Sequence, residues 1–158
     1  MLDMLVRLYD LPEIKPLLKG INTLGITIRN PMAHERFEVV HWVMESFGKR
    51  WAGECEAAFS RNPVSCFIAV REGAVIGFAC HDCTCKNFFG PMGVARDHRA
   101  KGVGKALLVS CLKAMKSMGY GYAVIGGTSM HEFYEHAVNA SVIQNSSPGI
   151  YPQPLKKS

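Results

Sequence analysis

The chain has 158 residues, of which 48% are hydrophobic and 20% are charged, and its formal net charge at pH 7 is +5. This composition predicts one compact domain with a hydrophobic core. No apolar run approaches the roughly 20 residues that span a bilayer, so we expect no membrane segment. The positive charge favours an anionic ligand but is too dispersed to indicate a nucleic-acid partner.

The N-terminus and the cysteines indicate the compartment. Residues 1–13 contain early acidic residues and neither a long apolar segment nor a small-residue cleavage site, so they do not resemble a signal peptide. The six cysteines lie in apolar stretches such as residues 65–70 and 107–115, where buried, reduced thiols are expected. We therefore expect a cytoplasmic protein.

Apolar periodicity predicts short strands and helices in the first half of the chain. In chain order these are a strand, a helix, a strand and two helices, over residues 4–9, 11–20, 25–30, 33–48 and 51–61. The apolar face of the helix at residues 33–48 is expected to contain Phe37, Val40, Trp42, Val43 and Met44.

From residue 65 the apolar residues alternate with a period of two. Residues 65–85 predict two antiparallel strands joined by a turn at Glu72–Gly73. A third strand follows, in which Gly90–Pro91 should open or bulge the ladder because proline has no N–H to donate. The remaining elements are a helix, a strand, a helix that Ser129 caps and Asn139 ends, and a final strand with a Pro-rich tail, over residues 102–118, 120–127, 129–138 and 140–155.

This order of elements predicts an α/β (α+β) fold with a mixed, mostly antiparallel central sheet flanked by helices. The long helix at residues 102–118 follows the third strand of the antiparallel meander and leads into the next strand. A connection of this length, made through a helix, allows the two strands to lie parallel.

The stretch "HRAKGVGKALL" places two glycines and three cations where that long helix begins. A helix N-terminus presents free backbone N–H groups at the positive end of the helix dipole, which suits a phosphate group. Gly102 and Gly104 allow a ligand to approach without an intervening Cβ atom. A nucleotide P-loop does not fit, because Arg99 and Ala106 stand where that motif requires glycine and Ser/Thr, and a dinucleotide fingerprint would need glycine at Leu107.

What does match is the pattern Arg-x-x-Gly-x-Gly at residues 99–104, between a predicted strand and a predicted helix. This pattern resembles the acetyl-CoA-binding signature of the GNAT superfamily of N-acetyltransferases, and "EFYEHAVNA" resembles the Phe-Tyr-Glu helix of that superfamily. The resemblance extends from Ser65 to the last strand. It implies a strand–helix extension at residues 1–24 and a GNAT domain at residues 25–158.

The resemblance implies acetyl-CoA as the cosubstrate and a sheet splayed between the strand at residues 88–95 and the strand at residues 121–126. It also implies cofactor-binding residues, namely Met92, Gly93 and Val94 for the pantetheine arm and Arg99, Ala100, Lys101, Gly102, Val103, Gly104 and Lys105 for the pyrophosphate. A backbone N–H near Met92 should polarise the thioester carbonyl. Tyr134 matches the tyrosine that protonates the departing thiolate in many relatives.

The base that deprotonates the acceptor amine is less defined by the sequence. Asp82 is the first candidate because an acid is unusual within "GFACHDCTC", and His81 and Glu45 are alternatives. The sequence departs from the family pattern at Gly127, where an asparagine is frequent, and at "AVNA", which displaces a glycine. Both departures concern the acceptor pocket rather than cofactor binding.

No metal site is expected. Cys80, His81, Cys83 and Cys85 are soft ligands close together, but in an extended strand Cys80 faces opposite to the other two cysteines. We expect transfer of an acetyl group to the primary amine of a small molecule by direct attack. Two alternatives stay open, a CoA-binding regulatory module without turnover and an enzyme that acetylates proteins or peptides. The sequence is also compatible with a homodimer.

Overall fold

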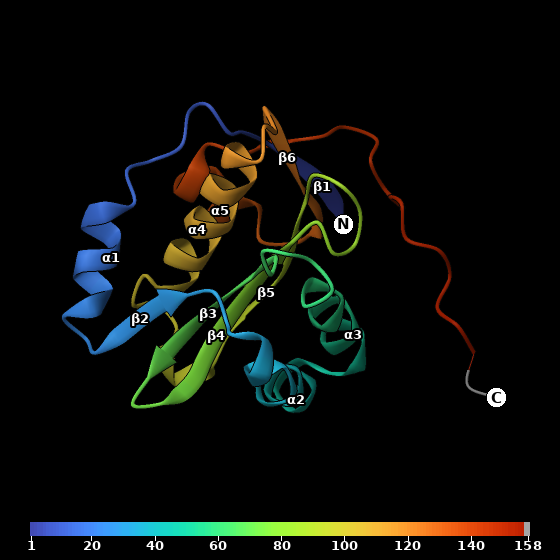
Figure 1. Ribbon diagram of the computed structural model, residues 1–158. Coiled ribbons are helices and arrows are strands. Elements are labelled where there is room, and N and C mark those ends of the chain that lie inside the picture. Colours follow the sequence, from blue (N-terminus) through green and yellow to red (C-terminus); the bar gives the residue numbers. More distant parts are fainter. Residues whose placement is uncertain (157–158) are drawn as a thin grey trace.

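A computed structural model describes residues 1–156, which fold into one mixed sheet with helices on both of its faces (Figure 1). The strands are β1 (Leu2–Arg7), β2 (Ile26–Arg29), β3 (Cys66–Arg71), β4 (Ala74–His81), β5 (Phe88–Val94), β6 (Tyr122–Thr128) and β7 (Ser141–Val142). The helices are α1 (Lys15–Asn22), α2 (Arg36–Phe47), α3 (Lys49–Ala58), α4 (Val103–Ser117) and α5 (His131–Val138). Short 3₁₀ turns cover Ala33–Glu35 and Arg96–His98.

The seven strands lie in the order β2-β3-β4-β5-β6-β1-β7. Every neighbouring pair is antiparallel except β5 and β6, which are parallel and connected through α4. The predicted fold class, a mixed and mostly antiparallel sheet flanked by helices, is therefore confirmed. None of the helices described here is long and apolar enough to cross a membrane.

The N-terminal strand is an interior part of this sheet. β1 lies between β6 and β7, and the side chains of Met4, Val6 and Leu8 are completely buried in the main core. The structure shows no boundary at residue 24. The division of the chain into an extension at residues 1–24 and a domain at residues 25–158 therefore stays a prediction from the family resemblance.

Helix α4 supplies most of the core on one face of the sheet. Nine of its residues are buried, because their spacing places an apolar face against the sheet while α1 and α5 cover its flanks. On the other face, α2 and α3 enclose a second cluster around Phe78, which is edge-on to Trp42 and tilted against Phe47 and Trp51. The sheet is thus covered on both faces.

Three local predictions are corrected by the structure. Helix α2 buries Val39 and Val43, whereas Phe37 is 76% exposed and Met44 is 38% exposed, so the predicted apolar face was wrong in part. Apolar residues surround this helix, and only the tertiary contact with β4 selects one face. Ser129 does not cap α5, because that helix begins two residues later and Thr128 Oγ1 accepts from the Met130 N–H at 3.0 Å. The final strand is limited to two residues.

Other local predictions are confirmed. Glu72 and Gly73 have φ angles of 51° and 78°, which suits a type I′ turn between β3 and β4. Asn139 has φ 52° and ends α5 in the left-handed conformation.

Leu108 tests the central place of α4 in the core. Its side chain is completely buried, and we expect Leu108→Ala to lower the free energy of unfolding by about 2–5 kcal/mol because a cavity remains. The matched control is Met118→Ala at the exposed end of the same helix, which should change it by about 0.5 kcal/mol or less. Urea titration followed by circular dichroism measures both, and equal effects would contradict this account of the core.

Candidate active site

The parallel strands β5 and β6 pair over a short length only. The paired residues are Phe88 with Val124 and Phe89 with Ile125, and beyond them the strands part. At that point two residues of β5, Gly90 and Pro91, lie opposite the single residue Cys80 of β4. This extra residue is a β-bulge, and Gly90 has φ +117°, a conformation that favours glycine. The sequence-based expectation of a bulge at Gly90–Pro91 is confirmed.

The bulge decides which way the backbone amides of β5 point. The N–H of Ala95 donates to the carbonyl of Ile76, at the β4 edge. Because successive amides of a strand point in alternate directions, the N–H groups of Met92 and Val94 point to the opposite edge, toward β6. In residues 1–156 no strand pairs with this edge of Met92–Val94, which is the edge assigned to pantetheine by the family resemblance.

Helix α4 begins directly beyond the free edge of β5. Gly102 precedes it with φ +82°, and no side chain of the described residues caps the helix, so the first N–H groups of α4 stay available to a ligand. Arg99 connects this loop to the strand, since its Nε donates to the carbonyl oxygen of Val94 at 3.0 Å. Lys101 Nζ donates to the carbonyl of Asp97 at 2.9 Å. The residues of the predicted pyrophosphate site therefore surround one helix N-terminus.

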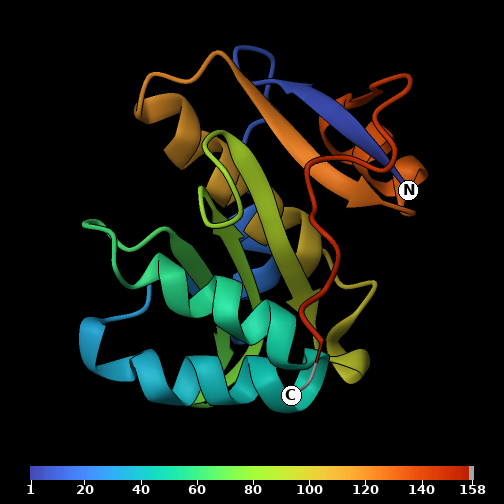
Figure 2. The same cartoon turned by 90° about the vertical axis from the view of Figure 1, so that its right-hand side faces the viewer.

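A cavity of about 600 Å³ lies where β5 and β6 part. Its walls come from β5, β6, α3, α5 and the C-terminal segment, which runs past β5 toward α2 and α3 (Figure 2). The lining side chains and backbone include Arg50, Trp51, Glu54, Thr84, Phe89, Gly90, Pro91, Met92, Ile125, Gly126, Gly127, Met130, Tyr134, Pro148 and Tyr151.

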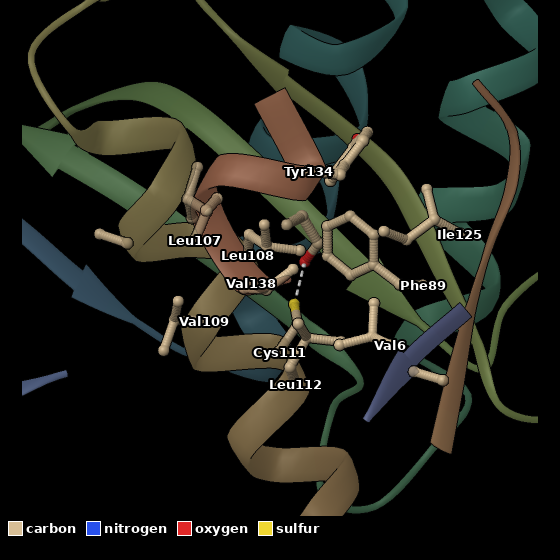
Figure 3. Close-up of a cluster of buried hydrophobic side chains, with 14 of the residues drawn as sticks. Val6, Phe89, Leu107, Leu108, Val109, Cys111, Leu112, Ile125, Tyr134 and Val138 are labelled. Carbon is tan, nitrogen blue, oxygen red and sulfur yellow. Dashed lines mark hydrogen bonds between the residues drawn. The ribbon is translucent and has the colours of Figure 1, made fainter. Parts of the chain in front are cut away.

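Tyr134 reaches this cavity from α5. Its ring is edge-on to Phe89 and Phe133, with centroids 6.3 Å and 5.0 Å away, and it lies beside Phe89 and above the core residues of α4 (Figure 3). Burial raises the pKa of Tyr134 to about 12. At neutral pH the side chain is therefore a phenol and carries a proton that it can donate.

Among the described residues that line the cavity, Glu54 is the only one with a carboxylate side chain. It lies on α3 and accepts a hydrogen bond from Thr84 Oγ1 at 3.0 Å. The sequence analysis did not identify it. The available signal was the spacing of Trp51 and Glu54, which places both on one face of the helix predicted over residues 51–61.

The structure does not bring the other predicted bases into the cavity. Asp82 is 1% exposed, and its Oδ1 accepts from the Asn87 N–H at 2.7 Å, so it closes the loop after β4. The neighbouring His81 is also buried, and this burial lowers the pKa of its imidazole. Glu45 is exposed on α2. None of the three lines the cavity, and their role as a base has no support from this arrangement.

The C-terminal segment and the N-terminal strand support the wall of the cavity around Gly126 and Gly127. The Arg50 guanidinium lies 4.7 Å from the ring centroid of Tyr151, and a Cβ atom on Gly126 would lie 2.6 Å from the Tyr151 hydroxyl. Asp3 accepts a hydrogen bond from the Gly127 N–H at 2.7 Å. Gly127, a departure from the family pattern, therefore uses its backbone to join β6 to β1.

In this fold a parted pair of parallel strands faces a helix N-terminus, an arrangement that can hold an extended ligand with an anionic end. The sequence over residues 36–138 matches the acetyltransferase (GNAT) family. The chain therefore belongs to this family. A comparison with curated protein sequences found no significant match.

Solved structures share the fold. One is the glucosamine N-acetyltransferase region of a fungal multi-domain β-N-acetylglucosaminidase, with TM-score 0.73 and 14% identity over 90% of this chain and 19% of that chain. Another is an N-acetyltransferase from Sphaerobacter thermophilus, with TM-score 0.65 and 20% identity over 90% of this chain and 48% of that chain. A third is an aminoglycoside acetyltransferase from an uncultured soil metagenomic sample, solved in complex with trehalose. Its TM-score is 0.54, with 11% identity over 72% of this chain and 88% of that chain. The chain spans less than half the length of the first two.

Gly102 tests the pyrophosphate site. We expect Gly102→Glu to weaken CoA binding by about 100-fold, about 2.7 kcal/mol, because a carboxylate would stand beside the phosphates. Gly102→Ala is the matched control, since it imposes the same strain at φ +82° without the charge, and it should retain most of the affinity. Isothermal titration calorimetry with CoA measures both, and similar affinities for the two variants would contradict the site.

Proposed function

We propose that the protein transfers the acetyl group of acetyl-CoA to the primary amine of a small molecule. The observation that carries this proposal is the cavity at the parted strands, which combines free amides of β5, the phenol of Tyr134 and the carboxylate of Glu54. Its volume of about 600 Å³ lies within the usual range for small-molecule sites, about 300–1,000 Å³. The residues present fit acetyl-CoA, because an extended arm has an unpaired strand edge to bind and its phosphates have a helix N-terminus.

In this proposal the protein residues act at three positions. The Met92 N–H donates to the thioester carbonyl oxygen and stabilises the negative charge that develops there. Glu54 attracts the protonated acceptor and takes its proton, directly or through water, so that the neutral amine can attack the carbonyl carbon. Thr84 orients the carboxylate by its hydrogen bond to Glu54.

The bond changes balance without a covalent enzyme intermediate. A bond forms between the amine nitrogen and the carbonyl carbon, the bond from that carbon to sulfur breaks, and the sulfur leaves with the electron pair. Tyr134 donates its proton to the thiolate. The product nitrogen then gives its remaining extra proton to the Tyr134 phenolate, directly or through water, which restores the phenol, and Glu54 releases to solvent the proton that it took from the ammonium group. The burial that raises the pKa of Tyr134 also raises the proton affinity of a thiolate leaving into the same cavity.

Glu54 and a panel of acceptors test this proposal. The assay measures CoA release from acetyl-CoA in the presence of one acceptor at a time, taken from amino sugars, polyamines, amino acids and peptides. We expect release with at least one small amine. Glu54→Gln should lower kcat/KM for that amine by about 10²–10⁴-fold, because the base is lost. The matched control Glu56→Gln changes an exposed carboxylate on the same helix and should have little effect. Turnover with peptides alone would overturn the small-molecule assignment, and CoA binding without any turnover would overturn catalysis.

Tyr134→Phe tests the proton donor. We expect kcat to fall by about 10²-fold or more while the Kd for CoA, measured by calorimetry, stays within about threefold. Because the pKa of Tyr134 is about 12, ionisation of this phenol should cause no decline in the wild-type rate below about pH 11. An unchanged kcat, or an alkaline decline that Tyr134→Phe abolishes, would contradict the assigned role.

A further inference from the structure

Three cysteines from three different elements meet outside the active-site cavity. Cys55 of α3, Cys66 of β3 and Cys80 of β4 have Sγ atoms that all lie within 4.8 Å of one another. Cys66 and Cys80 are direct partners across the β3–β4 pair, and Cys55 approaches them from the helix above. All three side chains are completely buried.

A fourth thiol lies at the edge of this group. Cys83 follows Cys80 in the spacing Cys-x-x-Cys, and the second of the two residues between them, Asp82, has φ 56°, so the extended strand ends there. Cys83 Sγ lies 3.6 Å from Ser65 Oγ, next to Cys66, and donates to the carbonyl oxygen of His81 at 3.3 Å, so it lies beside the three sulfur atoms that are within 4.8 Å of one another. Cys83 is half-buried and packs against the same apolar cluster as the other three cysteines.

The arrangement suits a tetrahedral thiolate site. With Zn–S bonds of about 2.3 Å, the sulfur atoms of a Cys₄ zinc site are about 3.8 Å apart, and Cys-x-x-Cys is a usual ligand spacing. The Sγ atoms of Cys55, Cys66 and Cys80 lie within 4.8 Å of one another and need to move by about 1 Å or less to reach that geometry, whereas the Cys83 side chain must turn from the His81 carbonyl toward them. An all-sulfur donor set selects zinc over calcium, magnesium or manganese, which prefer oxygen.

The other cysteines of the chain lack this arrangement. Cys111 is also completely buried, but it donates to the carbonyl of Ala79 at 3.5 Å and is not part of the cluster (Figure 3). Cys85 is exposed in the loop after β4. Burial alone therefore does not account for the cluster, in which three of the six cysteines meet and a fourth, Cys83, lies beside them.

We propose that Cys55, Cys66, Cys80 and Cys83 form a structural zinc site that joins α3 to the β3–β4 pair and to the loop after β4. The site has a consequence for the cavity, because Cys55 follows Glu54 and Cys83 precedes Thr84 in the sequence. The metal would hold the two segments that carry the Glu54–Thr84 hydrogen bond. Zinc binding is distinct from the acetyl transfer proposed above and does not depend on it.

Metal analysis and cobalt substitution of the full chain test this site. The protein is produced with added zinc, purified under reducing conditions and analysed by elemental mass spectrometry, and we expect about one zinc ion per chain. Refolding in the presence of Co²⁺ should give the visible and charge-transfer absorption of a tetrahedral cobalt thiolate. Absence of both zinc and that spectrum in reduced, folded protein would overturn the proposal.

The variants separate a metal site from a packed core. Cys83→Ser removes the half-buried ligand and should weaken Zn²⁺ binding by on the order of 100-fold in a chelator competition. Cys85→Ser is the matched control in the same loop and should leave Zn²⁺ affinity unchanged. Cys55→Ser should abolish the cobalt spectrum, and if that variant does not fold, the comparison of Cys83→Ser with Cys85→Ser decides. Equal zinc affinity in these two variants would refute Cys83 as a ligand and the tetrahedral site with it.

CoA affinity, measured by calorimetry on the same samples, is an independent readout. We expect Cys83→Ser to bind CoA as the wild type does, because the cysteines lie outside the strand edge and the helix N-terminus that hold the cofactor. Loss of CoA binding together with zinc binding would show general misfolding of the variant, and Cys55→Val, which keeps the core apolar without a ligand, then tests the metal site instead.

Discussion

The parting of β5 from β6 is the constraint on which the candidate site depends. Two residues of β5, Gly90 and Pro91, lie opposite one residue of β4, and the amides beyond them change direction. A regular strand here would continue to pair with β6 and leave no space. The bulge keeps β5 attached to β4 through Gly77–Val94 pairing while its other edge stays unpaired. The cavity and the free amides therefore have the same origin.

The apolar core keeps this opening aligned with the helix N-terminus. Helix α4 packs against the sheet along almost its whole length, so its first turn has a fixed position relative to the end of β5. Arg99 adds a direct link, because its guanidinium binds the Val94 carbonyl rather than remaining free in solution. The arginine of the family signature thus joins the loop to the strand. The backbone N–H groups of the first turn of α4, after Gly102, have no side-chain cap among the described residues and can donate to the anion that we propose binds there.

The part of the cavity that we propose receives the acceptor amine is assembled from segments far apart in the chain. Glu54 comes from α3, Thr84 from the loop after β4, Tyr134 from α5 and Tyr151 from the C-terminal segment. Asp3 of the N-terminal strand binds the Gly127 amide, so the first residues of the chain also support this wall. The residues proposed to bind the cofactor, by contrast, are contained in one continuous stretch, from Met92 to Lys105. The proposed thiolate site would act on the same wall through Glu54 and Thr84.

The sequence by itself determined the order of the elements, the Glu72–Gly73 turn, the bulge at Gly90–Pro91 and the glycine-rich loop before α4. These features are local, because glycine, proline and apolar periodicity act on neighbouring residues. Only the tertiary structure decided which face of α2 is buried, that Glu54 and not Asp82 lines the cavity, and that cysteines from three elements meet. Periodicity does not show which helix face meets which strand when apolar residues surround the helix. Proximity between distant segments depends on sheet order and side-chain packing, which no short stretch of sequence contains.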